Sequence, residues 1–445
     1  MHVDVDKVIE QSRIGPLHVF IVAIGFLIML FDGYDLVAMA MIVPVISAEW
    51  GLKPSDFSLA LSAALFGVLF GSGGAGIMGD WIGRRWTIVI MLLIAGVSMS
   101  MTPLVSSMNE LIAVRFVTGI GAGGCIPVTL AYTLEFMPRH VRNLLTVFMY
   151  SGAAMGTVIG GFLGPTLLQM GGWPYVFYFG GLLPITVVAI VLLALPESLR
   201  FLVAKHCKPE VAGALLQRIN PDFHHAAGND YGLKEVTHKG GPIHELFGGR
   251  QTAITLTLWL VFFGSQFLLF FIGLWMPTLL TAEGISLDTA LYVLALYNLG
   301  GVVGGTAFGA TGDRLSPMPV LIVAFSLAAV LVVAFGFSTH SMPLLIGVAI
   351  LAGGTVAGSA LMLGAVATGL YPTRARSTGI GWALGIGRFG SISAPLIGGA
   401  MLASGMGIKG MYTFAAVPAI LCAGGMVVLW RLTRAHEAEL SIESR

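Results

Sequence analysis

The chain has 445 residues, of which 56% are hydrophobic and only 10% are charged, and its mean hydropathy is +0.89. Soluble domains carry about 25% charged residues, so this composition excludes an ordinary soluble protein and indicates a membrane protein. The formal net charge of +1 gives no field that would attract a nucleic acid. The three cysteines, Cys125, Cys207 and Cys422, are too scattered for a disulfide framework.

Apolar runs long enough to cross a bilayer, about 20 residues each, occur in two groups of six. A polar stretch of some 55 residues separates the groups. We expect the spans at residues 17–46, 56–79, 86–106, 110–136, 143–168, 174–195, 252–281, 288–311, 317–337, 343–371, 377–404 and 410–431. The sequence therefore predicts an all-α membrane protein with 12 transmembrane helices. The polar N-terminus lacks the features of a signal peptide, so we expect the first span to be retained.

The first apolar run contains two aspartates near its middle, Asp32 and Asp35. A carboxylate at the centre of a membrane helix costs roughly 2.5–3.5 kcal/mol, and such residues usually face a polar cavity and have a function. A spacing of three places both side chains on one helix face. We therefore expect this face to line a polar route.

Basic residues gather in the loops on one side of the predicted spans. On the side of both termini and the central stretch lie Arg84, Arg85, Arg139, Arg142, Arg314, Arg374 and Arg376. The opposite side offers only Lys53 and Lys409. Because positive residues accumulate in cytoplasmic loops, we predict that both termini and the central stretch are cytoplasmic.

The two halves of the chain repeat a pattern. Gly79-Asp80 matches Gly312-Asp313, which is 233 residues later (312 minus 79), and the segment 138–142 matches 372–376 at an offset of 234 (372 minus 138). Parallel six-helix repeats are a transporter architecture. We predict an N-terminal bundle (1–195), a cytoplasmic central loop (196–251) and a C-terminal bundle with a cytoplasmic tail (252–445).

The central loop is rich in potential metal ligands, which are His206, Cys207, His224, His225, His238 and His244. No pair of them has zinc-finger spacing, and the stretch has mixed charge with several prolines and glycines. We interpret it as a solvated linker with short amphipathic helices, and we expect neither a metal nor a cofactor.

The segment that ends the second span and turns into the third has an unusual composition. Its characteristic residues are Gly76, Gly79, Asp80, Gly83, Arg84 and Arg85. This pattern resembles the loop signature of the major facilitator superfamily (MFS), and Gly309, Gly312, Asp313 and Arg314 form a weaker second copy. The resemblance covers the whole chain and implies the MFS fold. We expect Gly76, Asp80, Gly83, Arg84, Arg85, Asp313 and Arg314 to form the gating motif.

The fourth span contains Arg115, followed by Gly119, Gly121 and Gly124. No strand precedes these glycines, so they are not a dinucleotide site, and helix packing explains them. Arg115 resembles the arginine that the superfamily carries in its fourth helix, and its natural partner is an acid on the first span. The pair could be a static ion pair, or Arg115 could tune an acid that takes up and releases a proton.

The eleventh span carries Arg388, with Gly381 and Gly385 on the same face. The only acid in the predicted spans of the C-terminal half is Asp288, the end residue of its span, and the position 234 residues after Asp32 is the neutral Gln266. A planar guanidinium suits a carboxylate ligand. We therefore expect Arg388 to bind a substrate carboxylate, although pairing with an acid of the protein is the competing interpretation.

The sequence Asp32-Gly33-Tyr34-Asp35, together with Arg115 and Arg388, resembles the aromatic acid:proton symporters of bacteria. The resemblance implies that both aspartates are required for transport. It also suggests that Glu135, at the end of the fourth span, joins the proton path. Glu135 could equally pair with Arg139.

Other polar and aromatic residues of the spans are candidates for substrate contact. We predict that Tyr34 and Trp382 stack on a substrate ring and that Gln266 and Asn298 bond a ring hydroxyl. The fifth span points to another function, because Gly152, Gly156, Gly160, Gly161, Gly164 and Pro165 resemble the pattern of proton-driven efflux antiporters.

The function predicted from these features is import of a hydroxybenzoate-like aromatic carboxylate with protons, across the bacterial inner membrane, by alternating access. The alternative is an MFS efflux antiporter of small organic compounds. A membrane enzyme would need a nucleophile–base pair or a metal cluster, and the sequence offers neither. We expect the partners to be the aromatic acid, protons and the lipid bilayer, with no nucleic acid, and we expect a monomer.

Overall fold

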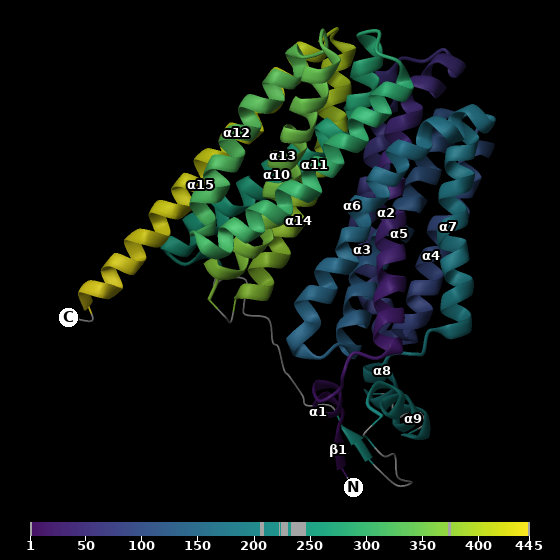
Figure 1. Cartoon of the computed structure of the whole chain (residues 1–445), viewed down its shortest axis with the longest axis vertical. Helices are drawn as coiled ribbons and strands as arrows, with labels where there is room; N and C mark the ends of the chain where they lie inside the picture. The colour runs from purple at the N-terminus through teal and green to yellow at the C-terminus, as the bar shows by residue number, and fades with distance from the viewer. Residues whose placement is uncertain are drawn as a thin grey trace. The chain divides into compact units, whose positions relative to one another are not determined.

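The computed structural model describes residues 2–204, 209–221, 223, 230–232, 246–372 and 375–443 of the chain. Within these ranges, twelve helices are long and apolar enough to cross a membrane (Figure 1). Their ends lie within a few residues of the predicted ones. The prediction of an all-α membrane protein with 12 spans is therefore confirmed.

The long helices run through the whole chain. They are α2 (Pro16–Trp50), α3 (Ser58–Ile82), α4 (Arg84–Met101), α5 (Met108–Phe136), α6 (Arg139–Gly171), α7 (Trp173–Ala194), α10 (Arg250–Ala282), α11 (Leu287–Arg314), α12 (Pro317–Phe337), α13 (Met342–Leu370), α14 (Arg376–Ala403) and α15 (Ile408–Glu443). The short elements are β1 (His2–Asp4), α1 (Val5–Glu10), η1 (Pro54–Phe57), η2 (Thr102–Leu104), α8 (Leu199–Ala204), α9 (Pro209–Ile219) and β2 (Asp230–Gly232).

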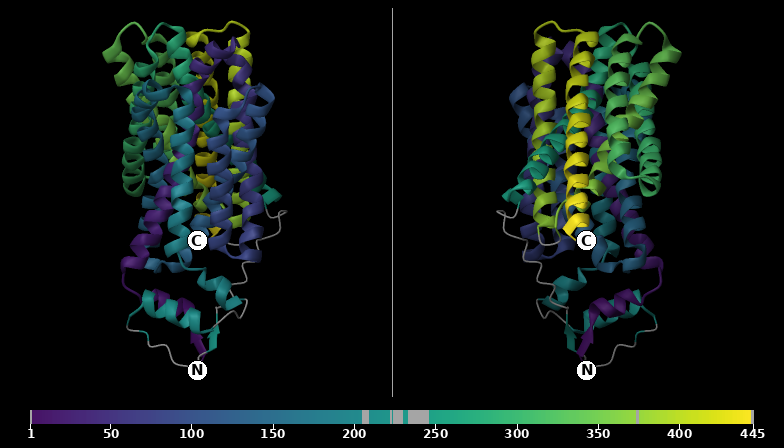
Figure 2. Two further views of the ribbon diagram at one scale, coloured as in Figure 1. Left: turned by 90° about the vertical axis from the view of Figure 1, so that its right-hand side faces the viewer. Right: turned by 90° about the vertical axis from the view of Figure 1, so that its left-hand side faces the viewer.

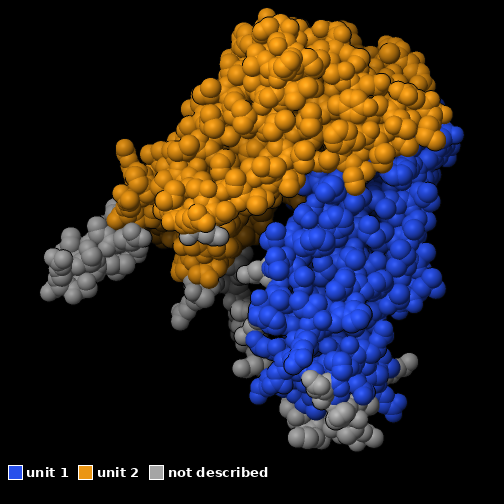
Figure 3. Space-filling model, viewed as in Figure 1, with its two compact units in different colours: residues 1–35, 66–156, 174–238 blue, residues 36–65, 157–173, 239–445 orange. Residues whose placement is uncertain are grey.

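Two compact units divide the described chain, and Figure 3 draws them in blue and orange. Unit 1 contains residues 1–35, 66–156 and 174–238, and unit 2 contains residues 36–65, 157–173 and 239–445. The division therefore runs through α2, α3 and α6 as well as through the central loop. The domain boundaries expected from the sequence follow the repeat, and they stay a prediction.

Close packing explains why parts of α3 and α6 belong to unit 2. The Ser62 hydroxyl of α3 donates to the carbonyl of Ile392 in α14 at 2.9 Å. A Cβ at Gly399 would lie 2.4 Å from the Cβ of Ser58, and a Cβ at Gly161 of α6 would lie 2.8 Å from that of Ala295. Small residues let these helix backbones approach closely.

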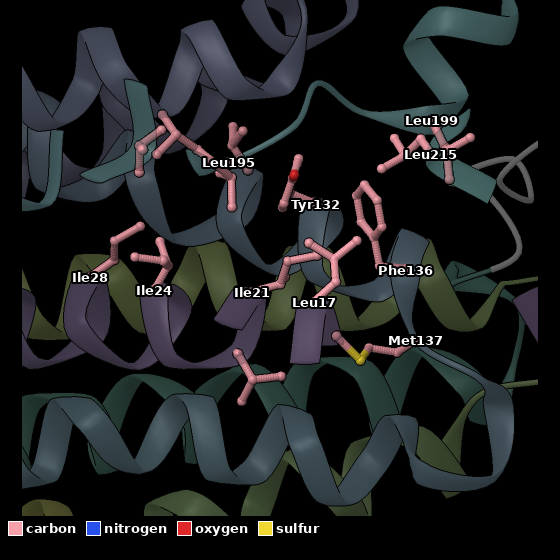
Figure 4. Close-up of a cluster of buried hydrophobic side chains, with 14 of the residues drawn as sticks. Leu17, Ile21, Ile24, Ile28, Tyr132, Phe136, Met137, Leu195, Leu199 and Leu215 are labelled. Atoms are coloured by element: carbon pink, nitrogen blue, oxygen red, sulfur yellow. The ribbon is translucent and has the colours of Figure 1, made fainter. Parts of the chain in front are cut away.

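Unit 1 has a hydrophobic core at the end where α2 begins (Figure 4). Leu17, Ile21, Ile24 and Ile28 repeat every three or four residues, so they form one stripe of α2. The residues packed in the same cluster include Tyr132, Phe136, Met137, Leu195, Leu199 and Leu215. The core therefore joins the membrane helices to the short helices α8 and α9.

The N-terminus folds onto the central stretch, as Figure 2 shows near the label N. Strand β1 pairs in parallel with β2, with Val3 opposite Tyr231. Asp4 caps α1 by accepting a bond from the Lys7 amide at 3.3 Å, and Val5 and Ile9 are buried in the unit 1 core. The sequence did not predict this pairing.

The central stretch contains the short helices that were expected, α8 and α9. Helix α9 buries Ala212, Leu215, Leu216 and Ile219, which is the amphipathic pattern of a helix lying on a core. Its potential metal ligands, namely His206, Cys207, His224, His225, His238 and His244, lie outside the described residues.

Candidate functional site

A buried ion pair joins α2 and α5 in unit 1. The two guanidinium nitrogens of Arg115 donate to the two carboxylate oxygens of Asp35 at 2.8 and 2.9 Å. Only 2% of the Arg115 side chain and 6% of the Asp35 side chain are exposed. The predicted pairing of Arg115 with an acid of the first span is thus present, and the acid is Asp35. Two parallel charge-assisted bonds offset part of the cost of burying both charges.

Asp32 has a different environment, one helical turn earlier on α2. It is half-buried, whereas Asp35 is buried. The residue after it, Gly33, packs so tightly against α6 that a Cβ would lie 1.8 Å from the carbonyl oxygen of Ala153. The backbones of α2 and α6 therefore approach each other closely at this point, beside Asp32.

Tyr34 is turned toward α7. Its hydroxyl donates to the carbonyl of Val176 at 2.8 Å, and its ring lies 5.5 Å from that of Phe179. The side chain is buried, because only 1% of the residue is exposed. Stacking of Tyr34 on a substrate ring stays a prediction that this packing does not support.

Glu135, at the end of α5, is buried in a polar cluster. It forms an ion pair with Arg84 and accepts a hydrogen bond from the Ser198 hydroxyl. The alternative partner considered from the sequence, Arg139, has a side chain outside the described part. Its proton-path role stays a prediction.

The turn between α3 and α4 is built around Gly83, whose φ is +97°. Glycine adopts this region without strain. The amides of Arg85 and Ser198 donate to the Glu197 carboxylate at 3.0 and 2.8 Å, and the Arg85 side chain donates to the Leu192 carbonyl at 2.6 Å. Sequence reasoning missed Glu197, although an acid just after the sixth span and Pro196 could have signalled it.

Other residues of the predicted gating motif make fewer contacts with the rest of the described protein. Asp80 is exposed and forms no ion pair with a described residue, and Gly76 has open space around it. In the second copy, Arg314 is likewise exposed, and the side chain of Asp313 lies outside the described residues. Their part in gating stays a prediction.

Arg388 lies on α14 in unit 2 and is half-buried. No carboxylate of the described residues lies within 4.0 Å of its guanidinium. A Cβ at Gly381 or Gly385 would meet no atom within 4 Å, so the predicted open face beside Arg388 is present. A cation in an apolar helix without an acid partner is suited to an anionic ligand.

Gln266 of α10 lies beside α14. A Cβ at Gly387 would be 3.1 Å from its Cγ, so Gln266 packs next to the residue that precedes Arg388. Trp382 is exposed on α14, and its ring stacks on Trp259 at 5.9 Å. Substrate contact by either residue stays a prediction.

A cavity of about 110 Å³ lies within unit 2. Its lining consists of Leu36 and Val37 of α2, Thr157 of α6, Leu269, Phe270, Gly273 and Leu274 of α10, and Leu294, Tyr297 and Asn298 of α11. The side-chain amide of Asn298 donates to the carbonyl of Leu294 at 2.9 Å. The buried hydroxyl of Tyr297 has no hydrogen-bond partner among the described residues. Of this lining, sequence reasoning had proposed only Asn298 for substrate contact.

Known proteins are similar to this chain in sequence. The sequence model of the Major Facilitator Superfamily matches residues 23–292 and 258–445. A gallate transporter of Pseudomonas putida is 36% identical over 426 residues, which cover 95% of this chain and 94% of the relative. The 4-hydroxybenzoate transporter PcaK of Pseudomonas aeruginosa is 32% identical, with 96% and 95% covered.

Solved structures agree with the fold. The crystal structure of a D-xylose-proton symporter matches 92% of this chain and 97% of its own, with a TM-score of 0.71 at 17% identity. The relatives are transporters in a transporter family, so the protein is not an enzyme. From the family match and the near full-length relatives it follows that this chain belongs to the major facilitator superfamily.

Proposed function

We propose that the protein imports an aromatic carboxylate, of the hydroxybenzoate kind, together with protons across the bacterial inner membrane. The names of its relatives support the substrate class, since they transport gallate and 4-hydroxybenzoate, and a 28% identical protein of Acinetobacter baylyi is a benzoate transport protein. The basic loops support cytoplasmic termini and a cytoplasmic central loop. Two six-helix halves would alternate access to the site while the protein acts as a monomer.

The observation that carries this proposal is the guanidinium of Arg388, which is half-buried and has no carboxylate partner among the described residues. A substrate carboxylate would supply that partner through two charge-assisted bonds. Its neighbours Gly381 and Gly385 leave room for a ligand on the same face. In this proposal, Arg388 of α14 therefore binds the negative charge of the substrate.

In this proposal, the aspartates of α2 take up the transported proton. Protonating Asp35 would break two hydrogen bonds with Arg115, whereas Asp32 is half-buried and reached more easily by water. We therefore assign the first proton to Asp32. Asp35 and Arg115 would hold α2 against α5 and would separate only if the helices move.

Together these groups give a cycle of charge neutralisation. On the outside, the acid anion neutralises Arg388 and a proton neutralises Asp32, which lowers the electrostatic cost of closing the site away from water. In the cytoplasm, where the pH is higher, Asp32 releases its proton and the anion leaves. Glu135, which Arg84 holds at the end of α5, would pass the proton onward.

An efflux antiporter is the competing function suggested by the glycines of the fifth span. In the structure these glycines serve packing. A Cβ at Gly152 would lie 2.3 Å from the carbonyl oxygen of Phe26, and one at Gly156 would lie 2.0 Å from that of Leu30. No specific observation therefore favours export.

Transport by purified protein in liposomes tests the proposal. Liposomes with a more acidic exterior should accumulate radiolabelled 4-hydroxybenzoate, and a protonophore should abolish the accumulation. Because weak acids also cross lipid unaided, protein-free liposomes and the Arg388→Ala variant set the baseline. Accumulation no greater than this baseline would refute the proposal, and expulsion of preloaded acid under this gradient would identify an antiporter.

A further inference from the structure

The serine that precedes α8 makes a contact that the proposed function does not use. We infer that Ser198 is a positioning residue for Glu135 and sets the pH at which Glu135 passes its proton onward. Its hydroxyl donates a hydrogen bond to the Glu135 carboxylate, which also pairs with Arg84. The inference rests on the proposed function, in which Glu135 belongs to the proton path.

The hydroxyl of Ser198 is committed to one orientation. Its oxygen accepts a hydrogen bond from the Phe201 amide at 3.1 Å, which makes Ser198 the N-cap of α8. A serine hydroxyl carries a single proton, and this proton is donated to the Glu135 carboxylate. Ser198 is 0% exposed, so bulk water does not compete for the bond.

The residues before α8 hold Ser198 in place independently of Glu135. The Tyr132 hydroxyl donates to the Pro196 carbonyl at 2.7 Å. The Ser198 amide donates to the Glu197 carboxylate at 2.8 Å. Ser198 could turn away from Glu135 only by breaking these bonds and the cap of α8.

The other charges near Glu135 nearly cancel, which leaves its direct partners to decide its charge state. Only 3% of the Glu135 side chain is exposed. Some charged residues of the described chain line the cavity beside Glu135 or bond the segment before α8. Apart from Arg84, they are Asp6 and Glu10 of α1, Arg85 of α4, Arg142 of α6, Glu197, and Arg200 of α8. These three acids and three bases have no net charge, so Arg84 and Ser198 are the groups that stabilise the carboxylate.

The hydrogen bond has a direct consequence for proton release. A donor to a carboxylate favours its ionised form. Without the Ser198 hydroxyl, Glu135 would hold a proton more readily and would release it only at a higher cytoplasmic pH. Loss of one hydrogen bond to a charged group corresponds to a shift of about one pH unit. Ser198 therefore lets Glu135 release its proton at a lower cytoplasmic pH.

Uptake at varied internal pH tests this role. Liposomes that contain the purified protein are kept at one external pH, and the initial rate of 4-hydroxybenzoate uptake is measured at several internal pH values. For Ser198→Ala, the midpoint of this profile should lie about one unit above that of the wild type. For Ser198→Thr, which keeps the hydroxyl, it should stay at the wild-type value.

Two more variants separate the hydrogen bond from the helix cap. Glycine is tolerated at an N-cap much better than alanine, so Ser198→Gly should shift the midpoint as far as Ser198→Ala while it lowers the unfolding temperature less. Ser198→Gly also carries the test if Ser198→Ala does not fold. Ser107→Ala removes the N-cap hydroxyl at the other end of α5, which accepts from the Glu110 amide at 3.4 Å. It should leave the midpoint unchanged.

The outcomes separate this inference from the proposed function. If the rate of Ser198→Ala falls equally at every internal pH and the midpoint does not move, Ser198 is only a helix cap and the inference is wrong. The inference is also wrong if Ser198→Ala shifts the midpoint of the Glu135→Gln variant as far as that of the wild type. If the wild type takes up no more acid than protein-free liposomes, the proposed function fails, and the inference fails with it.

Discussion

The Arg115 guanidinium of α5 donates two parallel hydrogen bonds, of 2.8 and 2.9 Å, to the Asp35 carboxylate of α2, and both side chains are almost fully buried. Such a pair is not a source of net stability by itself. Its energetic importance is that neither partner can be removed alone without leaving a charge in an apolar environment.

Breaking this pair should therefore destabilise the protein. We expect Arg115→Ala, which strands the Asp35 carboxylate, to cost about 3–5 kcal/mol, and the double variant Arg115→Leu/Asp35→Leu to cost less. Thermal unfolding in detergent measures both, with Glu283→Gln as a control for loss of an exposed acid. A double variant less stable than Arg115→Ala would show that the pair stabilises the fold directly.

Asp32 should be needed for coupling rather than for binding. With Asp32→Asn, the site holds no titratable group at this position, so we expect loss of accumulation driven by a pH gradient while exchange of labelled for unlabelled acid continues. Uptake and exchange in liposomes measure the two processes. Unchanged accumulation would remove Asp32 from the proton path.

Arg388 should recognise the charge of the substrate. Arg388→Ala should weaken binding of 4-hydroxybenzoate about tenfold or more, the scale of a charge-assisted hydrogen bond, and should hardly affect its amide. Arg388→Lys should restore part of the affinity, because a lysine keeps the charge but not the planar fork. Arg431→Ala, which removes an exposed arginine of α15, is the control. Equal losses for acid and amide would rule out carboxylate pairing.

Gly83 should tolerate no side chain. Its φ of +97° strains any other residue by about 1–3 kcal/mol, and a Cβ there would lie 2.8 Å from the Glu197 carboxylate. Gly83→Ala should lower the unfolding temperature and the transport rate. Gly73→Ala on α3 lies outside the motif, has open space around it and should lower neither. Wild-type behaviour of Gly83→Ala would show that this turn is not constrained.

The N-terminal strand and helix should be a folded part of unit 1. Ile9 is buried with Leu215 and Ile219 of α9, so Ile9→Asp would place a charge in this core. We expect faster proteolysis between residues 209 and 232 while the membrane helices stay intact. Glu10→Gln keeps the apolar contacts and serves as the control. Equal cleavage of both variants would mean that α1 does not hold α9 in place.

Much of the fold was predictable because a bilayer demands long apolar helices. The partner of Arg115 was predictable only as an acid of the first span, since Asp32 and Asp35 share one helix face and spacing alone cannot choose between them. The choice of Asp35 depends on how α2 is rotated against α5.

Other features left no readable pattern in the sequence. Strands β1 and β2 have three residues each and lie more than 200 residues apart, so neither has a periodic signal. The cavity at Tyr297 exists only where four helices leave a gap in their packing. Glu197 accepts a hydrogen bond from the Arg85 amide because the turn at Gly83, with its positive φ, brings that amide to the Glu197 carboxylate.

Proton movement that accompanies the substrate is the most direct test of coupled import. Adding 4-hydroxybenzoate to liposomes that contain the protein, with no initial pH gradient and with the membrane potential held at zero, should make the outside more alkaline. The rise in external pH should exceed that of protein-free liposomes, and this excess should disappear with Asp32→Asn. Uptake of the acid without any proton influx beyond that background would contradict symport.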